Sequence, residues 1–216
     1  MDSPGDNKFM RAHIIGIAGP SSSGKTELAR QLAARLPGTA IVSLDSYYRG
    51  MEEIPLEDRK KVNFDHPDAL DWELLHEHLA AIAAGRAFEE PVYSFADYAR
   101  TAETRPIEPS RYLIVEGLFV LYWPELRATL DTKVYVQTDP GVCFNRRLRR
   151  DVAERGRTPE SVIEQYEKTV RPSAEWFVNP TQKYADLTVS GEEPLDRSTS
   201  AVIAALNRAT AAAGGR

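Results

Sequence analysis

Short apolar runs alternate along the chain with longer segments in which apolar residues recur every three or four positions. The run at 13–18 is typical of a buried strand, and 27–36 follows as a helix with its leucines on one face. Further strands are expected at 39–44, 112–115, 133–136 and 186–189. Further helices are expected at 72–84 and 124–130, from 140 and 159 onward, and at 195–211. This alternation predicts an α/β fold, a parallel sheet with helices on both faces.

Capping signals mark the start of several helices. Asp71 precedes the helix at 72–84, and its carboxylate can accept a hydrogen bond from the first turn. Asp139–Pro140 and Thr158–Pro159 each place a capping side chain before a proline, the residue favoured at the first helical position.

Two stretches interrupt the alternation. Residues 49–61 are polar and are expected to form a loop or a short helical turn. Residues 91–95, together with 101–107, are expected to form a small antiparallel excursion that lies over the main sheet.

The first strand and helix are joined by G-P-S-S-S-G-K-T at 19–26, which fits the phosphate-loop pattern G-x-x-x-x-G-K-[ST]. A strand that enters a helix through this loop aims backbone N–H groups at one point, where the helix dipole adds positive charge. Lys25 supplies charge for the outer phosphates, and the Thr26 hydroxyl can ligate Mg²⁺. A serine-rich turn is the alternative, but the flanking strand and helix favour a nucleotide site and make the expected fold a P-loop NTPase-type parallel sheet. The expected residues of the site are Gly19, Ser21, Ser22, Ser23, Gly24, Lys25 and Thr26.

Two carboxylates follow predicted strands. Asp45 comes after 39–44 and Glu116 after 112–115, and open α/β sheets bind ligands at the carboxyl ends of their strands. Asp45 is therefore a candidate base for an incoming hydroxyl, and Glu116 a candidate to hold Mg²⁺ through water. Each acid can instead cap a loop or a helix, but two acids beside a phosphate loop favour the functional interpretation.

A run of arginines lies on and after the helix that begins at 140. It contains Arg146, Arg147, Arg149, Arg150, Arg155 and Arg157. One interpretation is a solvated helix face paired with Asp151 and Glu154. A second is a helical lid that closes guanidinium groups over a triphosphate, since their forks match phosphate oxygens. A third is nucleic-acid binding, which the acidic background and the lack of interleaved aromatic residues oppose.

Aromatic residues gather in the irregular segments rather than in the periodic ones. They are Tyr48, Phe64, Tyr93, Phe95 and Tyr98. Aromatic faces in loops can sandwich a flat ring of a substrate, and the alternative is packing in a minor hydrophobic core.

Composition narrows the class of protein. The chain has 216 residues, which is enough for one domain, expected over 12–212 between a disordered tail at 1–11 and a loose end at 213–216. The net charge of −5 argues against a nucleic-acid partner. Cys143 is the single cysteine and fits a reducing, cytoplasmic location. No apolar run approaches the length of a membrane span.

Several longer segments resemble the uridine–cytidine kinase family in order along the chain, from about His13 to about Gly191. The similar segments are Asp45–Tyr48 (D-S-Y-Y), Asn63–Ala69 (N-F-D-H-P-D-A), Pro91–Phe95 (P-V-Y-S-F), Glu116–Gly117, Glu154–Arg157 (E-R-G-R) and Lys183–Asp186 (K-Y-A-D). The N-F-D-H-P-D and E-R-G-R segments are far more specific than the phosphate loop.

The resemblance implies roles for individual residues. Asp45 matches the catalytic base that takes the proton of the ribose 5′-hydroxyl, and Asp65 matches the acid that binds the ribose hydroxyls with Arg147 and Gln165. Phe64, Tyr93 and Phe95 match residues around the base, joined in the expected pocket by Tyr48 and Tyr98. Arg150, Arg155 and Arg157 match lid arginines, of which the first two act with Lys25 in catalysis. The resemblance also implies ATP or GTP as donor, Mg²⁺ held by Thr26 and Glu116, and a homo-oligomer, either a tetramer or a dimer.

Two positions depart from the family pattern P-V-Y-D-F-x-x-H. Ser94 stands in place of the Asp, and Tyr98 in place of the His that contacts the polar edge of the base. Cytosine presents a donor amine at that edge and uracil an acceptor carbonyl. A hydroxyl held as an acceptor favours cytidine, whereas a freely rotating one serves either base. The interpretation adopted is a preference for cytidine.

The predicted function is ATP-dependent phosphorylation of uridine or cytidine to UMP or CMP in pyrimidine salvage. The nearest alternative is a related kinase with another acceptor, such as phosphoribulokinase or pantothenate kinase. A GTPase switch would need an N-K-x-D guanine motif, which the sequence lacks. A non-catalytic nucleotide-binding regulator is disfavoured by the complete set of Lys25, Thr26, Asp45 and Glu116.

Overall fold

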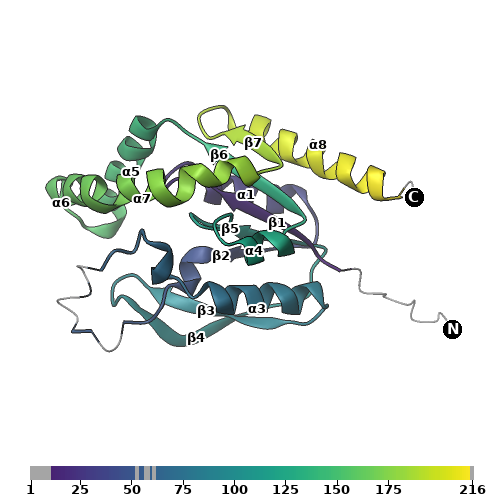
Figure 1. Ribbon diagram of the computed structural model, residues 1–216, viewed down its shortest axis with the longest axis horizontal. Coiled ribbons are helices and arrows are strands. Elements are labelled where there is room, and N and C mark those ends of the chain that lie inside the picture. Colours follow the sequence, from purple (N-terminus) through teal and green to yellow (C-terminus); the bar gives the residue numbers. More distant parts are fainter. Residues whose placement is uncertain (1–10, 52–53, 56–58, 60–61, 215–216) are drawn as a thin grey trace.

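A five-stranded parallel sheet forms the centre of the protein, with the strand order β2-β5-β1-β6-β7 (Figure 1). The computed structural model describes residues 11–51, 54–55, 59 and 62–214. The strands are β1 His13–Ala18, β2 Thr39–Ser43, β5 Tyr112–Glu116, β6 Thr132–Gln137 and β7 Leu187–Ser190. The predicted parallel sheet is confirmed. Its inner strands are continuous apolar runs because helices cover both faces of the sheet.

Helices cover the two faces of the sheet in separate layers. On one face lie α1 Lys25–Arg35 and α8 Leu195–Gly214, whose side chains pack against β1, β6 and β7. On the other face lie α3 Trp72–Ala83 and α4 Pro124–Thr129. The two hydrophobic clusters on either side of the sheet account for the buried apolar positions of the predicted helices.

The antiparallel excursion is present and is longer than expected. Strand β3 Phe88–Ser94 pairs with β4 Ala99–Ile107, with a register shift between Pro91 and Tyr93. Phe88 and Ile107, at the start and end of the pair, are buried in the same cluster as α3. The hairpin is thereby anchored at one end, and the turn at its other end lies beside the segment that follows β2 (Figure 1).

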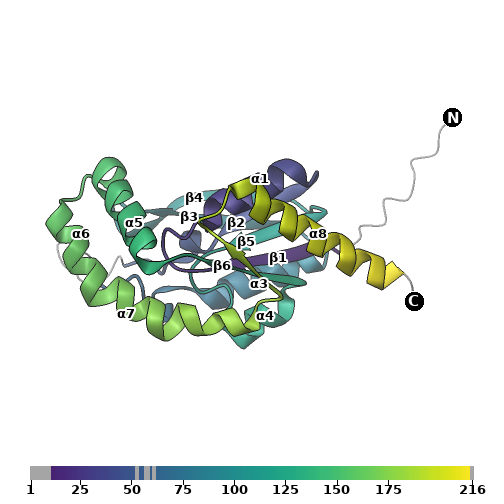
Figure 2. The same ribbon diagram turned by 90° about the horizontal axis from the view of Figure 1, so that it is seen from above.

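The three expected caps are confirmed. Asp71 accepts a hydrogen bond from the Leu74 N–H, Asp139 from Gly141 and Val142, and Thr158 from Ser161. Helix α5 Pro140–Arg155 ends at Gly156, whose left-handed conformation is a common way to end a helix. Figure 2 shows α5 and α6 Pro159–Gln165 at the end of the molecule opposite to the C-terminal end of α8.

Residues 166–184, to which the periodicity assigns no element, continue the helical path of α6. They form π-helical turns at Tyr166–Val170 and Ala174–Val178, the short α7 Arg171–Ser173 between them, and a 3₁₀ segment at Asn179–Tyr184. Pro172 and Pro180 lack an amide N–H, which interrupts the regular α-helical hydrogen bonds here.

The ends of the expected domain are only partly described. Residues 1–10 of the predicted tail and residues 215–216 lie outside the described part, while Arg11 donates to Asp131 at 2.7 Å. Helix α8 extends to Gly214, two residues beyond the expected boundary at 212. Within the described residues, the helices are all too short or too polar to cross a membrane.

Candidate active site

The phosphate loop connects β1 to α1 in the middle of the sheet. Its backbone is left-handed at Ser22, with φ of 62°, and at Gly24, with φ of 105°. A Cβ on Gly24 would meet no atom of the described residues within 4 Å, whereas one on Gly19 would lie 2.5 Å from the carbonyl oxygen of Val136. The loop therefore packs tightly against β6 at Gly19. At Gly24 it leaves the space next to the N-terminus of α1 open, and the helix dipole favours an anion there.

The serines of the loop differ in their partners. The Ser21 hydroxyl accepts a hydrogen bond from Arg147 Nη1 at 2.9 Å. The hydroxyl oxygens of Ser22 and Ser23 are buried and have no hydrogen-bond partner among the described residues. Because a buried polar group without a partner costs free energy, these residues fit a ligand rich in oxygen atoms, as a triphosphate is.

Lys25 is buried at the base of the loop. Its ammonium donates to the carbonyl oxygen of Pro20 at 2.7 Å. Burial lowers the pKa of Lys25, and the carboxylates of Glu116 and Asp45 act in the opposite direction. These carboxylates favour the charged ammonium, which is the form that attracts phosphate oxygens.

Glu116 ends β5 directly beside the loop. Its Oε1 accepts hydrogen bonds from Thr26 Oγ1 at 3.1 Å and from Ser43 Oγ at 3.2 Å. Burial raises the pKa of Glu116, against the effect of Lys25. The described residues contain no group of three or more acidic, His or Cys side chains that suits a metal ion. One carboxylate with hydroxyl oxygens does fit Mg²⁺, which takes few protein ligands and is completed by water and phosphate.

Asp45 lies in the 3₁₀ turn Leu44–Tyr47, two residues beyond the end of β2. Its backbone N–H donates to the Ser43 hydroxyl at 3.4 Å. Asp45, Thr26 and Glu116 line one cavity of about 330 Å³. Burial raises the pKa of Asp45, and the positive charges of Lys25 and the nearby arginines lower it in part. The structure thus brings the acids at two adjacent strand ends to the phosphate loop.

Asp65, Arg147 and Gln165 meet, although they are far apart in sequence. Arg147 Nη1 lies 4.0 Å from Asp65 Oδ1, and Nη2 donates to Gln165 Oε1 at 2.9 Å. Thr169 adds a hydroxyl 3.4 Å from Asp65 Oδ2. Burial raises the pKa of Asp65, and Arg147 lowers it in part. The cluster joins the N-F-D-H-P-D segment to α5 and α6, and Arg147 also reaches the phosphate loop through Ser21.

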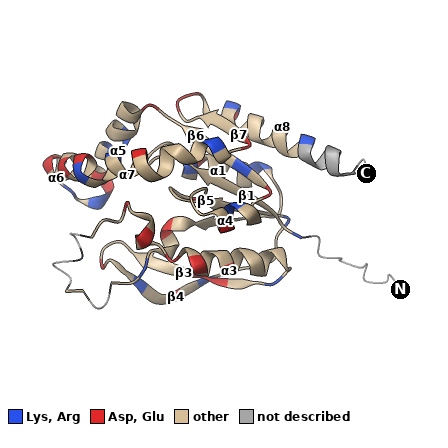
Figure 3. Cartoon of the chain, in the orientation of Figure 1, with Lys and Arg blue, Asp and Glu red and all other residues tan. Residues whose placement is uncertain are grey.

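Four arginines of the run converge on a single carboxylate, that of Asp151 on α5, which is fully buried. Arg150 Nη2 lies 2.8 Å from Asp151 Oδ1, and Arg147, Arg155 and Arg157 come within 3.5–3.7 Å of one of its oxygens. The expected pairing with Asp151 is confirmed, but the face is not simply solvated, because Arg147 is itself buried. Charged positions of both signs gather around α6 at this end of the molecule (Figure 3).

The five aromatic residues form one cluster. Tyr48 is buried at its centre, with ring centroids 5.5 Å from Phe64, 5.3 Å from Tyr93 and 6.2 Å from Phe95. Tyr98 stacks on Phe64 at 5.4 Å. The Arg155 guanidinium lies 5.2 Å from the centre of the Phe95 ring, so α5 and the hairpin touch across the site.

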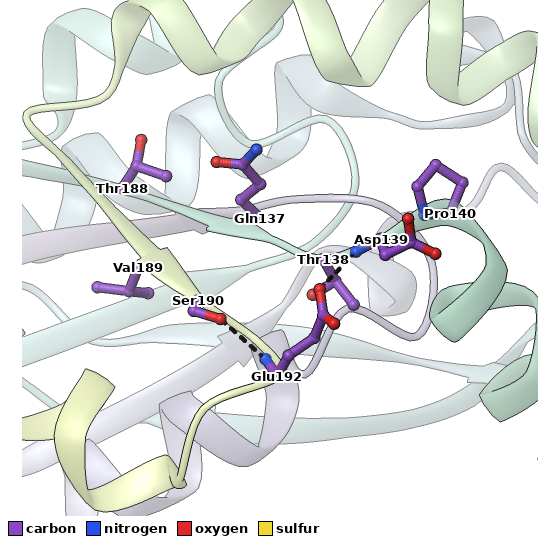
Figure 4. A pocket seen from close by; sticks show the side chains of 8 residues that line it. All are labelled: Gln137, Thr138, Asp139, Pro140, Thr188, Val189, Ser190 and Glu192. Atoms are coloured by element: carbon purple, nitrogen blue, oxygen red, sulfur yellow. Dashed lines mark hydrogen bonds between the residues drawn. The ribbon is translucent and has the colours of Figure 1, made fainter.

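A second cavity, of about 450 Å³, lies where β6 and β7 end and α5 begins (Figure 4). Its lining includes Gln137, Thr138, Asp139 and Glu192, whose Oε1 accepts from the Asp139 N–H at 2.8 Å. The Thr138 hydroxyl donates to the carbonyl oxygen of Ser23, which ties this cavity to the back of the phosphate loop. Of these residues the sequence marks only Asp139, and only as a helix cap.

Comparison with known proteins identifies the family. The model of the phosphoribulokinase / uridine kinase family matches residues 14–194. The chain belongs to the phosphoribulokinase / uridine kinase family. It is 48% identical over 180 residues to the uridine kinase of Chloroflexus aurantiacus, a match that covers 82% of this chain and 86% of the relative. It is 40% identical over 185 residues to the uridine kinase of Ligilactobacillus salivarius, covering 85% and 87% of the two chains.

Solved structures of kinases share the fold. Phosphoribulokinase from Rhodobacter spheroides matches with a TM-score of 0.65 at 16% identity, covering 86% of this chain and 74% of that one. D-glycerate 3-kinase from Cryptococcus neoformans matches with a TM-score of 0.64 at 18% identity, covering 85% and 88%. At these identities the likeness concerns the fold of the family and not the acceptor that its members use.

Sequence reasoning missed several residues around the site. Ser43 bonds Glu116 and the backbone of Asp45, and Thr169 faces Asp65. Glu90 and Arg105 line the cavity that holds Asp45. Their positions carry no motif, and the only available signals were that Glu90 precedes P-V-Y-S-F and that Thr169 lies one helical turn after Gln165.

Proposed function

We propose that this protein transfers the γ-phosphoryl group of ATP to the ribose 5′-hydroxyl of uridine or cytidine. The observation that carries the proposal is the cavity of about 330 Å³ in which Asp45, Thr26 and Glu116 meet beside the phosphate loop. Tyr93 and Phe95 of the aromatic cluster line the same cavity, and the relatives at 40–48% identity are named uridine kinases. A phosphate cradle, a candidate base and a pocket for a flat ring are the parts that this reaction needs.

In the proposed reaction Asp45 takes the proton of the 5′-hydroxyl while the hydroxyl oxygen attacks the γ-phosphorus. The bond between the γ-phosphorus and the bridging oxygen breaks, and ADP leaves. The raised pKa of the Asp45 carboxylate makes it a stronger base than an exposed aspartate. Lys25, Arg150 and Arg155 stabilise the negative charge on the transferring group, which is the main source of catalysis in this class of reaction.

Mg²⁺, when bound, neutralises charge on the outer phosphates, and Thr26 and Glu116 would hold it. Asp65 is proposed to accept hydrogen bonds from the ribose hydroxyls, with Arg147 and Gln165 orienting it. Arg157 also donates to Gln165 Oε1. A residue proposed to orient the ribose and an arginine proposed for the lid are therefore joined by a hydrogen bond. The donor is proposed to be ATP, with its base toward the cavity of about 450 Å³ behind the phosphate loop, and GTP is the alternative.

The decisive experiment is ADP release measured separately with uridine and with cytidine in the presence of ATP and Mg²⁺. Ribulose 5-phosphate and pantothenate serve as alternative acceptors, because the family and its fold include kinases for other hydroxyl groups. Release that depends on a pyrimidine nucleoside is expected. Release that depends only on another acceptor would replace the proposed substrate, and ATP binding without any release would replace the reaction.

A preference for cytidine is the finer part of the proposal. Tyr98 has a φ of 52° in the hairpin turn and stacks on Phe64 of the aromatic cluster. Tyr98→His should raise kcat/KM for uridine relative to cytidine, and histidine tolerates the left-handed backbone of this position. An unchanged ratio of the two kcat/KM values would contradict a role of Tyr98 in reading the base.

A further inference from the structure

Strand β2, which leads to Asp45, lies at the edge of the sheet. It pairs with β5 on one side and is the first strand in the order, so its other edge has no strand partner in the described part of the chain. An open edge leaves backbone groups that need partners. Two side chains of the β3–β4 hairpin supply them. The Ser43 N–H donates to Glu90 Oε1 at 3.2 Å, and Arg105 Nη2 donates to the Ile41 carbonyl oxygen at 2.7 Å.

Glu90 and Arg105 also bind each other. They lie directly opposite on the two strands of the hairpin. Arg105 Nε donates to Glu90 Oε2 at 2.8 Å, and Nη2 donates to the same oxygen. The Glu90 side chain is 2% exposed and that of Arg105 is 55% exposed. A buried carboxylate held by an arginine fork on one side and a backbone N–H on the other has a defined position.

This pair connects to the reacting groups through one residue, Ser43. The Ser43 N–H is bound by Glu90, while the Ser43 hydroxyl donates to Glu116 and accepts from the N–H of Asp45. Glu90, Arg105 and Asp45 line the same cavity. The hairpin that carries the pair continues past a register shift to Tyr93 and Phe95 of the aromatic cluster.

We propose that Glu90 and Arg105 are positioning residues for phosphoryl transfer. They bind the edge of β2 as a further strand would. They thereby hold Asp45 and the aromatic cluster in a fixed position relative to each other. The inference rests on the proposed function, because it concerns how the acceptor nucleoside is presented to Asp45. Among the described residues, neither forms a hydrogen bond or ion pair with the phosphate loop, so loss of the pair should affect the acceptor and leave donor binding as it is.

The hairpin has other attachments that keep it folded without this pair. Arg100 donates to the carbonyl oxygens of Tyr47 and Tyr48 and to Asp71 Oδ2, and Phe88 and Ile107 are buried at the far end. Loss of the Glu90–Arg105 pair should therefore displace the hairpin relative to β2 and not detach it. A displacement of about 1 Å at a reacting group can cost up to about 10²-fold in rate.

The test compares Arg105→Gln and Glu90→Gln with Glu89→Gln in the whole protein. Glu89 is the matched control, because it lies next to Glu90 on the exposed face of the hairpin, where it accepts only a hydrogen bond from Thr104 among those described. Arg105→Gln is the safer variant for folding, since the side chain that it replaces is half exposed. Kinetics with uridine and with ATP varied separately, ATP binding and thermal unfolding are measured for each.

For Arg105→Gln and Glu90→Gln, kcat/KM for uridine should fall roughly 10- to 100-fold, with the dissociation constant of ATP unchanged. The double variant should lose little more than either single variant, because each side chain holds the other in place and the two act as a unit. Arg105→Lys should recover part of the loss, since an ammonium can bind Glu90 or the Ile41 carbonyl but not both as the fork does.

Kinetics equal to those of Glu89→Gln would overturn the proposal. An equal fall in kcat/KM for uridine and for ATP, together with a lower unfolding temperature, would also overturn it. Such a result would indicate a general structural role. The unsubstituted protein is assayed in parallel. If it shows no nucleoside-dependent ADP release, the proposed function fails; if it does and the variants match the control, only the positioning role fails.

Discussion

The donor side and the acceptor side of the site are built in different ways. The phosphate loop consists of eight consecutive residues, 19–26, at the junction of the central strand β1 and the helix α1. The acceptor side combines side chains from the turn after β2, from the N-F-D-H-P-D segment, from the hairpin and from α5 and α6. The first is mainly backbone held by the middle of the sheet, and the second is mainly side chains held by contacts at its edge.

This difference predicts that the two halves can be damaged separately. Only a few contacts cross between them, chiefly those of Arg147 with Ser21 and with Asp65, and those of Ser43 with Glu116. A substitution on one side should therefore change the kinetic parameter of one substrate, and a substitution between the sides should change turnover.

The largest effect is expected for Asp45→Asn, which lies between the two halves. Turnover should fall roughly 10²–10⁴-fold, the usual contribution of a general base, while ATP binding remains close to that of the unsubstituted protein. Single-turnover kinetics and ATP titration measure the two quantities. Near-normal turnover would remove Asp45 from the reaction, and lost ATP binding would show that the halves are not separate.

Gly191→Ala should damage the donor side. A Cβ at Gly191 would lie 2.0 Å from the carbonyl oxygen of Ser23 and 2.2 Å from Thr138 Oγ1, so the phosphate loop must move by about 1 Å. We expect kcat/KM for ATP to fall by up to about 10²-fold, with uridine binding retained. Equilibrium binding of each ligand alone checks this, and an equal loss for uridine would argue against separate halves.

Asp65→Asn should damage the acceptor side. The substitution keeps the shape but removes the charge that faces Arg147 and the Thr169 hydroxyl. Loss of hydrogen bonds to a charged acceptor costs about 1.5–3 kcal/mol, so the KM for the nucleoside should rise roughly 10- to 100-fold. The KM for ATP should stay within about twofold. If Asp65 binds a ribose hydroxyl, the KM values of Asp65→Asn and of the unsubstituted protein should differ less for a deoxyribonucleoside than for the ribonucleoside.

The smallest effect concerns the pH dependence. Burial raises the pKa of Asp45, and the base must be ionised to act, so kcat/KM for the nucleoside should rise with pH through that raised pKa. The acid limb should lie above the range of an ordinary aspartate, about pH 4. A pH profile at saturating ATP and Mg²⁺ tests this. Activity already constant from about pH 4 upward would contradict a buried Asp45 as the base.

The sequence alone predicted the elements of the fold closely. The apolar runs identified each strand of the sheet, and Asp71, Asp139 and Thr158 marked the first turns of their helices. These features depend on interactions within a few residues, so local patterns report them. Residues 166–184 were the exception, because π-helical turns interrupted by prolines have neither the helical nor the strand period.

The candidate site also has a part that the sequence predicted and a part that it did not. The phosphate loop could be predicted because its eight residues are consecutive, and the resemblance supplied Asp45, Asp65 and the lid arginines as single positions. Their geometry could not be predicted from the residues. The i,i+4 spacing on α5 does place Arg147 and Arg155 near Asp151, but no local pattern records that Arg147 also reaches Asp65 and Ser21.

Local sequence therefore determined which segments become strands, helices and a phosphate loop, since short-range hydrogen bonding and apolar periodicity are sufficient for these choices. Only the tertiary structure decided that Glu90 and Arg105 bind the edge of β2, and that five distant aromatic side chains form one cluster. The physical reason is that such contacts join residues separated by tens of positions, and their partners are chosen by the packing of whole elements against the sheet.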